Sequence, residues 1–344
     1  MKKVRLGQTG LMVTKTSFGA LPIQRVSMDE AVKILRRAYR GGINFFDTAN
    51  AYTDSEEKIG AALGDVREDI ILATKSAPVP LERFKANIYN SLEKLKTDYL
   101  DLLQIHNPPR MYAPGEEDGL YDCLRDLKDQ GVIRHIGMTA HRPDVALAAV
   151  QSGLYETLQY PFSVLSAQRD LDLVEECRKR DVGFIAMKAM SGGLIQNPAA
   201  TFAFLQRFDN VVPIYGIQRM EELEEWLALD ASPPPFGEET EALIRREREE
   251  LAGDFCRSCG YCLPCPAGIP IPNAARISFL MTRAPYAPYL TQSWREDMDK
   301  IEGCLHCGDC ASRCPYGLDT PALLQKQLGW YNEFYAAHRQ EAAR

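Results

Sequence analysis

Four side chains with complementary acid–base chemistry lie in the N-terminal third of the chain. Asp47, Lys75 and His106 each follow a short apolar segment directly, and the phenol of Tyr52 lies five residues after Asp47. A cation beside a phenol favours the phenolate and lowers the pKa of the phenol, and Asp47 is suited to hold that cation. His106 is suited to donate a hydrogen bond to a carbonyl oxygen or to relay a proton. This set predicts hydride addition to a carbonyl group, with Tyr52 as the general acid.

Each of these residues has an ordinary explanation when it is taken alone. An aspartate after a strand is often a helix cap, a lysine there is often a salt-bridge partner, and a histidine there is often a buried core residue. Their occurrence after consecutive apolar segments favours the catalytic interpretation.

Eight of the ten cysteines form two closely spaced runs in the C-terminal third of the chain. The first run contains Cys256, Cys259, Cys262 and Cys265, and the second contains Cys304, Cys307, Cys310 and Cys314. A proline follows each run. The second run has the spacing of bacterial ferredoxins, whereas the last interval of the first run is one residue shorter. This arrangement predicts iron–sulfur clusters, and zinc on the same thiolates is the alternative. Cys123 and Cys177 lie in helical patterns and are expected to be packed thiols.

The elements that must position the acid–base set alternate between strand and helix over about the first 230 residues. The strand candidates are 16–19, 43–46, 70–74, 99–105, 133–138, 157–160, 184–187 and 211–215. They are continuous apolar runs, which are typical of a parallel sheet buried on both faces. Eight strand–helix repeats predict an α/β fold of the (β/α)8 TIM-barrel type. A doubly wound open sheet is the alternative, but no Gly-x-Gly-x-x-Gly follows the first strand.

Two local patterns mark the start of this region. A hairpin over residues 4–13, turning at 8–10, is expected before the first strand. Ser27 with Glu30 three residues later is a capping-box pattern, which predicts the start of a helix. Because such barrels carry their sites at the C-terminal ends of the strands, Asp47, Lys75 and His106 are expected on one rim.

The composition divides the chain into four parts. These are a barrel over 1–232, a linker and charged helix over 233–253, a small iron–sulfur domain over 254–320 and a helical tail over 321–344. The iron–sulfur domain is expected to be ferredoxin-like, mostly helical and rich in loops. Three consecutive prolines make the linker stiff, and the charged helix is expected to be an exposed spacer. The apolar and aromatic residues of the tail are expected to pack against the rest of the protein.

The overall charge and hydropathy exclude several classes of partner. The chain has 40 basic and 47 acidic residues, giving a formal net charge of -7, which argues against nucleic acid or an anionic membrane as the main partner. No apolar run has the length of a transmembrane helix or a signal peptide, so a cytoplasmic location is expected. In a reducing compartment, clustered thiols are more often metal ligands than disulfides.

Several segments resemble those of the aldo-keto reductase family. They are 47–52, 72–76, 101–108, 136–139 and 186–194, together with Gln159. The resemblance covers about residues 4–230. It implies a (β/α)8 barrel, an Asp–Tyr–Lys–His tetrad, a small carbonyl or alcohol substrate, and a nicotinamide cofactor. That cofactor is usually NADPH, with NADH as the alternative.

The same resemblance implies which residues contact the cofactor. Thr139 and Gln159 would lie near the nicotinamide carboxamide, with Lys188 following the seventh strand. Gly192, Gly193 and Leu194 would lie under the pyrophosphate, and Gln218 and Arg219 would face the adenosine end. Arg219 is the expected contact of a 2′-phosphate. The chain has Thr139-Ala140-His141 where family members often have Ser-Asn, so the preference between NADP and NAD stays open.

The two cysteine runs resemble two-cluster 4Fe–4S ferredoxin domains. This resemblance implies that Cys256, Cys259 and Cys262 share one cluster with Cys314. It implies that Cys304, Cys307 and Cys310 share the other with Cys265. The clusters are expected to exchange electrons with a ferredoxin-like partner or a substrate radical, and a purely structural role is the alternative.

Together these features predict an NAD(P)-linked oxidoreductase that acts on an aldehyde, a ketone or the matching alcohol. The alternative is a redox-sensing regulatory protein that binds a nicotinamide cofactor and signals through its clusters.

Overall fold

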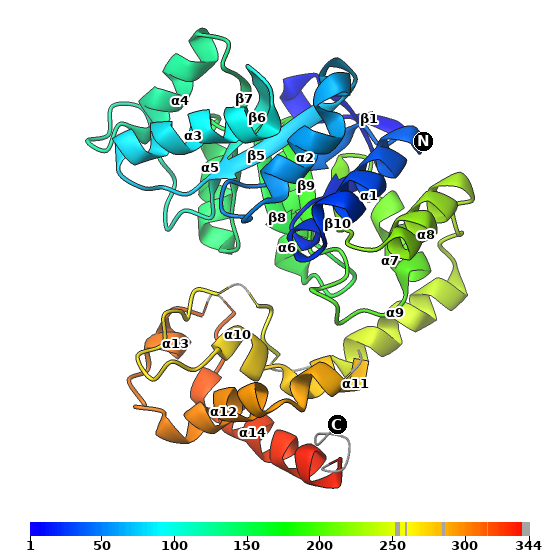
Figure 1. The fold of residues 1–344 in the computed structure, drawn as a ribbon, viewed down its shortest axis with the longest axis vertical. Helices are drawn as coiled ribbons and strands as arrows, with labels where there is room; N and C mark the ends of the chain where they lie inside the picture. Colours follow the sequence, from blue (N-terminus) through cyan, green and yellow to red (C-terminus); the bar gives the residue numbers. More distant parts are fainter. Residues whose placement is uncertain (252–254, 259, 284–285, 315, 339–344) are drawn as a thin grey trace. The chain divides into compact units, whose positions relative to one another are not determined.

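The computed structural model describes residues 1–251, 255–258, 260–283, 286–314 and 316–338. The chain divides into two compact units (Figure 1). The first comprises Met1–Ala189 and Pro198–Thr240, and the second comprises Met190–Asn197 and Glu241–Arg344.

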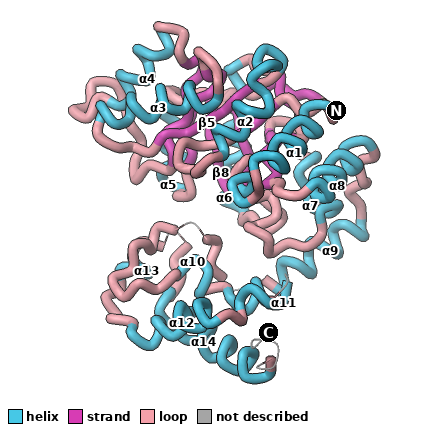
Figure 2. The backbone as a smooth tube through the Cα atoms, in the orientation of Figure 1, coloured by secondary structure: helices cyan, strands magenta, loops and turns pink. Residues whose placement is uncertain are grey.

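The first unit is a closed barrel of eight parallel strands. The strands pair in the order β10-β3-β4-β5-β6-β7-β8-β9. Their bounds are β3 Ser17–Gly19, β4 Phe45–Asp47, β5 Ile71–Ser76, β6 Leu100–His106, β7 Ile133–Thr139, β8 Thr157–Pro161, β9 Gly183–Met187 and β10 Val211–Gly216. The strands, magenta in Figure 2, are covered by helices, which explains their continuous apolar character. The predicted (β/α)8 barrel is therefore confirmed.

Eight helices alternate with these strands. They are α1 Met28–Arg40, α2 Ser55–Leu63, α3 Leu81–Leu95, α4 Leu120–Asp129, α5 Pro143–Ser152, α6 Gln168–Lys179, α7 Pro198–Gln206 and α8 Met220–Ala231. The capping box predicted at the start of α1 is present, because Ser27 Oγ accepts from the amide of Glu30 while the Glu30 carboxylate accepts from the amide of Ser27.

The predicted N-terminal hairpin is also present. Strands β1 (Lys3–Arg5) and β2 (Met12–Thr14) pair antiparallel, with Val4 opposite Val13. Val4, Leu6 and Val13 share an apolar cluster with residues of β4, β5, β6, β9 and β10. The hairpin therefore extends the core of the barrel.

The second unit is helical and rich in loops, as expected. Its helices are α9 Glu238–Glu250, which begins in the first unit, α10 Ile271–Ala274, α11 Ile277–Arg283, α12 Gln292–Asp299, α13 Asp309–Ser312 and α14 Thr320–Ala337. One apolar cluster joins Ile271 and Ile277 to Leu324 and Tyr331 of α14. The C-terminal tail therefore packs into the core of the cysteine-rich segment, as the sequence predicts.

The division differs from the expected boundaries in two places. The segment Met190–Asn197 lies within the range expected for the barrel but clusters with the second unit. Most of α9, which was expected to be a spacer within 233–253, clusters with the second unit as well. Both segments belong to the second unit because of their contacts in space, which the order of residues in the sequence does not reveal. Across the described residues, no helix has the length and apolar character required to cross a membrane.

Candidate active site and cysteine cavities

Asp47 and Lys75 form a buried ion pair at the C-terminal ends of β4 and β5. Lys75 Nζ lies 2.6 Å from Asp47 Oδ1 and donates a second hydrogen bond, of 2.5 Å, to the carbonyl oxygen of Thr48. In the barrel register, Asp47 pairs with Ala73 of β5, and Lys75 pairs with Gln104 of β6. Adjacent strand ends thus bring the two charges together.

Tyr52 and His106 complete the predicted set, from the β4–α2 loop and the end of β6. Lys75 Nζ lies 5.1 Å from the centre of the Tyr52 ring. The rings of Tyr52 and His106 meet edge to face, with their centroids 5.8 Å apart. Thr53 and Asn107, which follow these two residues, have left-handed backbones with φ of 30° and 53°. Such strain in non-glycine residues is concentrated at functional sites.

Burial dominates the electrostatics of this set. Burial raises the pKa of Tyr52, Lys75 acts to lower it, and Asp47 acts to raise it, with a net rise. The expected net lowering of this pKa is therefore wrong for the chain alone, because desolvation of the phenolate outweighs the attraction of Lys75. Burial, with a smaller contribution from Lys75, lowers the pKa of His106 to about 3. At neutral pH the phenol keeps its proton and the imidazole is neutral.

Gln104 is a site residue that the sequence reasoning missed. Its Nε2 donates to Gln159 Oε1 at 2.8 Å and to Asp47 Oδ2 at 3.4 Å. Gln159 Nε2 lies 3.4 Å from Asp47 Oδ1. The side-chain amides of Gln104 and Gln159 therefore position the Asp47 carboxylate, which in turn pairs with Lys75. A lone amide within the apolar run of β6 is the signal that could have identified Gln104.

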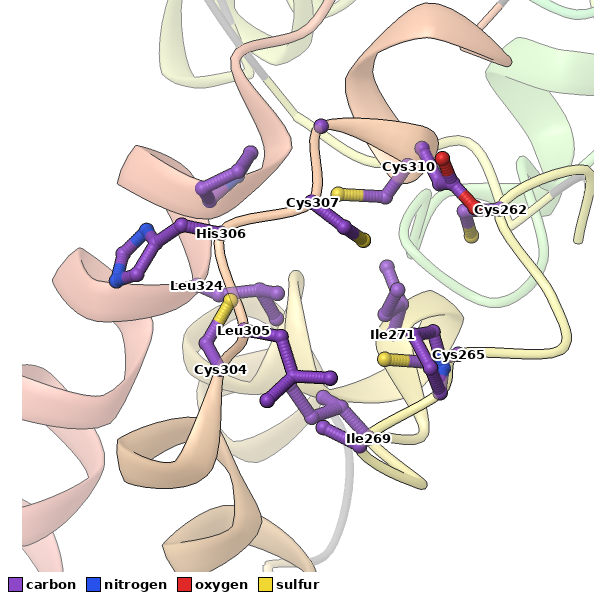
Figure 3. Close-up of a pocket in the computed structure, with 15 residues that line it drawn as sticks. Cys262, Cys265, Ile269, Ile271, Cys304, Leu305, His306, Cys307, Cys310 and Leu324 are labelled. Atoms are coloured by element: carbon purple, nitrogen blue, oxygen red, sulfur yellow. The ribbon is translucent and has the colours of Figure 1, made fainter.

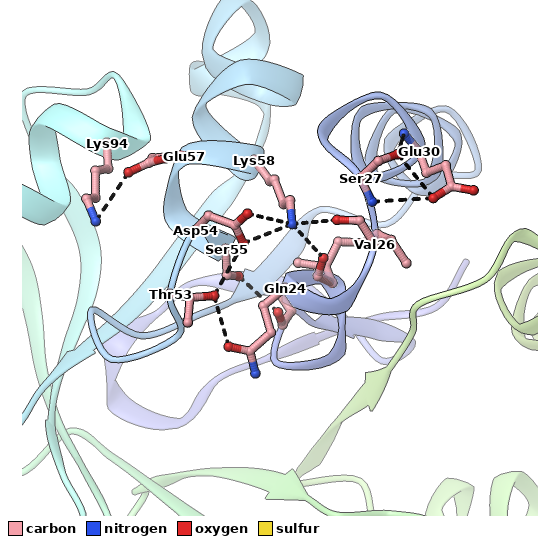
Figure 4. Close-up of polar contacts among 12 residues, drawn as sticks. Gln24, Val26, Ser27, Glu30, Thr53, Asp54, Ser55, Glu57, Lys58 and Lys94 are labelled. Atoms are coloured by element: carbon pink, nitrogen blue, oxygen red, sulfur yellow. Dashed lines mark hydrogen bonds and ion pairs between the residues drawn. The ribbon is translucent and has the colours of Figure 1, made fainter. Parts of the chain in front are cut away.

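The loop that carries Tyr52 is anchored by a buried lysine. Lys58 of α2 is 1% exposed, and its ammonium lies 2.9 Å from Asp54 Oδ1. The same ammonium donates to the carbonyl oxygen of Val26 at 2.7 Å (Figure 4). It also donates to the carbonyl oxygen of Ile23, at 3.2 Å. These contacts fix the chain two residues after Tyr52.

The expected cofactor contacts of the first unit lie at strand ends and before α8. Thr139 ends β7 and is 1% exposed, and Lys188 follows β9 with a φ of 59°. Gln218 and Arg219 donate backbone hydrogen bonds to the carboxylate of Glu222. Arg219 Nε also lies 2.9 Å from Glu222 Oε1, so Arg219 would have to share or release this carboxylate to bind a phosphate.

The residues expected under the pyrophosphate lie in the segment that clusters with the second unit. The Gly193 amide donates to the Met190 carbonyl oxygen at 2.9 Å. The carbonyl oxygen of Gly192 lies 3.5 Å from Arg276 Nη1, and Leu194 is fully buried. The turn would have to open before the Gly193 amide could reach a phosphate.

The second cysteine run lines a cavity together with the end of the first. This cavity, of about 380 Å³, is bordered by Cys304, Cys307, Cys310, Cys262 and Cys265 (Figure 3). The figure shows their sulfur atoms around a common space that is closed on one side by isoleucine and leucine side chains. His306, between two of the cysteines, has a φ of 50°.

A neighbouring cavity, of about 370 Å³, adds Cys256 and Cys314, which do not border the first cavity. It is bordered by Cys256, Cys262, Cys310 and Cys314. Cys259, a further predicted ligand, lies outside the described residues. The first run thus meets Cys314, and the second run meets Cys265.

These thiols suit a polynuclear cluster. The described cysteines border two spaces with partly apolar walls. Soft sulfur donors around such spaces match iron–sulfur clusters, whose ligands are thiolates.

Comparisons with known proteins agree with both units. Residues 10–211 match the aldo/keto reductase family, and residues 255–319 match the 4Fe-4S dicluster domain. L-galactose dehydrogenase of Arabidopsis thaliana is 34% identical over 209 residues, which cover 55% of this chain. The match spans 66% of that relative, slightly under two thirds of its length.

Solved structures share the barrel. An aldo-keto reductase from Bacillus halodurans in its holo form has a TM-score of 0.62 and 23% identity, over 72% of this chain and 96% of that one. An aldo-keto reductase from Klebsiella pneumoniae in complex with NADPH has a TM-score of 0.59 and 22% identity, over 71% of this chain and 94% of that one. At these identities the likeness shows the fold. The family match covers more than half of the 344 residues of this chain. The chain therefore belongs to the aldo/keto reductase family and continues into a 4Fe-4S dicluster domain.

Proposed function

We propose that this protein is an NAD(P)(H)-dependent oxidoreductase that interconverts an aldehyde or ketone with its alcohol. The observation that carries the proposal is the Lys75 ammonium, which lies 2.6 Å from Asp47 Oδ1 and 5.1 Å from the centre of the Tyr52 ring. A reduced nicotinamide, when bound, supplies a hydride to the carbonyl carbon. Tyr52 donates its proton to the carbonyl oxygen, which becomes the hydroxyl, and Lys75 stabilises the phenolate left behind. Neutral His106 donates a hydrogen bond to the same oxygen.

NADP(H) is the cofactor we propose, with NAD(H) as the alternative. The support is the NADPH bound to the Klebsiella pneumoniae relative and the position of Arg219 ahead of α8. Thr139, Gln159 and Lys188 would contact the nicotinamide half. Gly192, Gly193, Leu194 and Gln218 would contact the remainder.

Replacement of Tyr52 by phenylalanine tests the chemistry. In Tyr52→Phe, NADPH-dependent reduction of a panel of small aldehydes and ketones should fall by about 10²–10⁴-fold, the usual contribution of a general acid. The dissociation constant for NADPH, measured by fluorescence titration, should stay near the wild-type value. Tyr89→Phe is the matched control, because Tyr89 is 51% exposed on α3. Full turnover by Tyr52→Phe would remove Tyr52 from the mechanism.

Failure of the wild-type protein to reduce any member of the panel, alongside tight NADPH binding, would support a different function. The protein would then be a redox-sensing regulator that reads the nicotinamide cofactor and signals through its clusters.

We further propose two 4Fe–4S clusters in the second unit. Cys256, Cys259 and Cys262 would hold one with Cys314, and Cys304, Cys307 and Cys310 would hold the other with Cys265. The support is that Cys265 borders one cavity with three cysteines of the second run, while Cys314 borders the other with Cys256 and Cys262; Cys262 and Cys310 border both cavities. Iron, sulfide and zinc analysis of anaerobically purified protein, with EPR before and after reduction, tests this assignment. Two zinc ions and no iron would contradict it.

The clusters would pass single electrons to or from a ferredoxin-like partner. Cys307 is the exposed cysteine of the first cavity described above, which favours electron exchange with an external protein at this site. A structural role is the alternative. If a folded, cluster-depleted Cys307→Ser variant keeps full NADPH-dependent carbonyl reduction, the clusters have no obligatory part in that reaction.

A further inference from the structure

Arg276 is a buried cation in the second unit, and no carboxylate among the residues that the structure describes pairs with it. It joins α10 to α11 and is 8% exposed. The ionisable groups that act on it are the thiol of Cys256 and the phenol of Tyr289, and no carboxylate among the described residues is one of them. Its Nε has no hydrogen-bond partner within the described structure. Burial of such a charge is energetically costly unless an anion compensates it.

The position of Arg276 in the chain indicates where that anion lies. Ala275, the residue directly before Arg276, borders a cavity together with Cys256. This is the 370 Å³ cavity to which we assign one cluster. A 4Fe–4S cluster with four thiolate ligands is an anion, so it would supply the missing counter-charge. Nearby positive charge is one of the factors that set cluster potentials.

The other side of Arg276 faces the segment 190–197. Its Nη1 lies 3.5 Å from the carbonyl oxygen of Gly192, and a Cβ at Gly192 would lie 3.0 Å from the same nitrogen. Gly192 has a φ of +69°, which glycine adopts without strain. The amides of Gly193 and Ile195 both donate to the carbonyl of Met190, so the segment forms a tight turn against the guanidinium.

We propose that Arg276 is a positioning residue that couples the cluster at Cys256 to the segment 190–197. The cluster balances its charge, and Nη1 holds the carbonyl of Gly192, so loss of this cluster would release the segment. The inference rests on the proposed cluster ligation.

Arg276→Gln in the full-length, anaerobically purified holoprotein tests the coupling. Removal of a buried positive charge makes electron addition less favourable. The equilibrium constant for one-electron reduction of one cluster should therefore fall about tenfold, a potential about 59 mV more negative, in an EPR-monitored titration. The second cluster should keep its potential. Hydrogen exchange of the peptide covering 190–197 should accelerate at least tenfold, at wild-type iron content.

Two further proteins keep the test decisive. Arg178→Gln removes the same charge from an exposed side chain on α6 of the barrel, where Arg178 pairs with Glu175, and it should change neither readout. Wild-type protein stripped of iron by an anaerobic chelator should show the same faster exchange of 190–197, and this arm does not depend on the folding of a variant. Unchanged exchange after chelation, or wild-type potentials and exchange in Arg276→Gln, would overturn the proposal. Absence of iron from the wild-type protein would instead refute the cluster assignment itself.

Discussion

At the residue scale, Tyr52 is subject to opposing effects. Burial and Asp47 raise its pKa, while Lys75 lowers it. The balance keeps the proton on the phenol at neutral pH, which suits carbonyl reduction. Alcohol oxidation needs the phenolate, and Lys75 is the cation that stabilises it. The contribution of Lys75 to the rate of alcohol oxidation should therefore grow as the pH falls below the pKa of Tyr52.

Replacement of Lys75 by methionine should separate the two directions. Without the ammonium, the pKa of Tyr52 rises further, so the pH at which oxidation reaches half its maximum should increase, and oxidation at a fixed lower pH should fall about tenfold for each pKa unit. Reduction should also slow, because the phenolate product is less stable. The measurement is the pH profile of kcat in both directions. His106, whose pKa burial lowers to about 3, should add no inflection above pH 5.

The control for Lys75→Met addresses the carboxylate of Asp47, which loses its cation in that variant. Asp47 would then be a buried charge without a cation, so Asp47→Asn/Lys75→Met restores a neutral pair of similar volume. We expect the double variant to regain stability in denaturant unfolding but not the oxidation rate. A wild-type oxidation profile in Lys75→Met would show that this lysine does not stabilise the phenolate.

At the element scale, the sequence predicts the bounds of the strands, because these depend on which local segments are buried. The eight strands were predicted within about two residues of their bounds, because strands buried on both faces must be continuously apolar. The contact of Gln104 with Asp47 was missed, because it requires the barrel register and the inward direction of both side chains. The net rise in the Tyr52 pKa was missed for a related reason, since burial depends on the assembled tertiary structure.

The β4–α2 loop provides the element-scale prediction. Lys58→Met should leave Asp54 and the carbonyls of Val26 and Ile23 without their donor, at a cost of about 1–3 kcal/mol in the free energy of unfolding. Because these contacts follow Tyr52, kcat should fall several-fold while the NADPH dissociation constant stays near wild type. Lys94→Met is the matched control, since Lys94 forms a partly exposed ion pair with Glu57, 3.3 Å away (Figure 4). An equal loss of kcat in both variants would contradict a specific role for Lys58.

At the scale of the whole molecule, the two units differ in what stabilises them. The barrel has a core built from eight strands and an N-terminal hairpin. The second unit has a core that surrounds two cavities bordered by cysteines. If the proposed clusters fill these cavities, their binding free energy is part of the folding free energy of this unit. That the segment 190–197 joins this unit could not be read from the sequence, because it follows a barrel strand.

The distribution of the three tryptophans allows the two units to be observed separately. Trp226 is 4% exposed and stacks on Tyr215 of the barrel at 3.8 Å between ring centroids. Trp294 and Trp330 pack against the core of the second unit. In Trp294→Phe/Trp330→Phe, anaerobic iron chelation should leave the thermal midpoint of Trp226 fluorescence unchanged while far-UV circular dichroism loses helical signal. In Trp226→Phe, the same treatment should lower the fluorescence midpoint, because the remaining tryptophans report the unit that loses its ligands. A fall of the Trp226 midpoint in step with the second unit would show that the chain unfolds as one cooperative block, and that cluster loss destabilises the barrel as well.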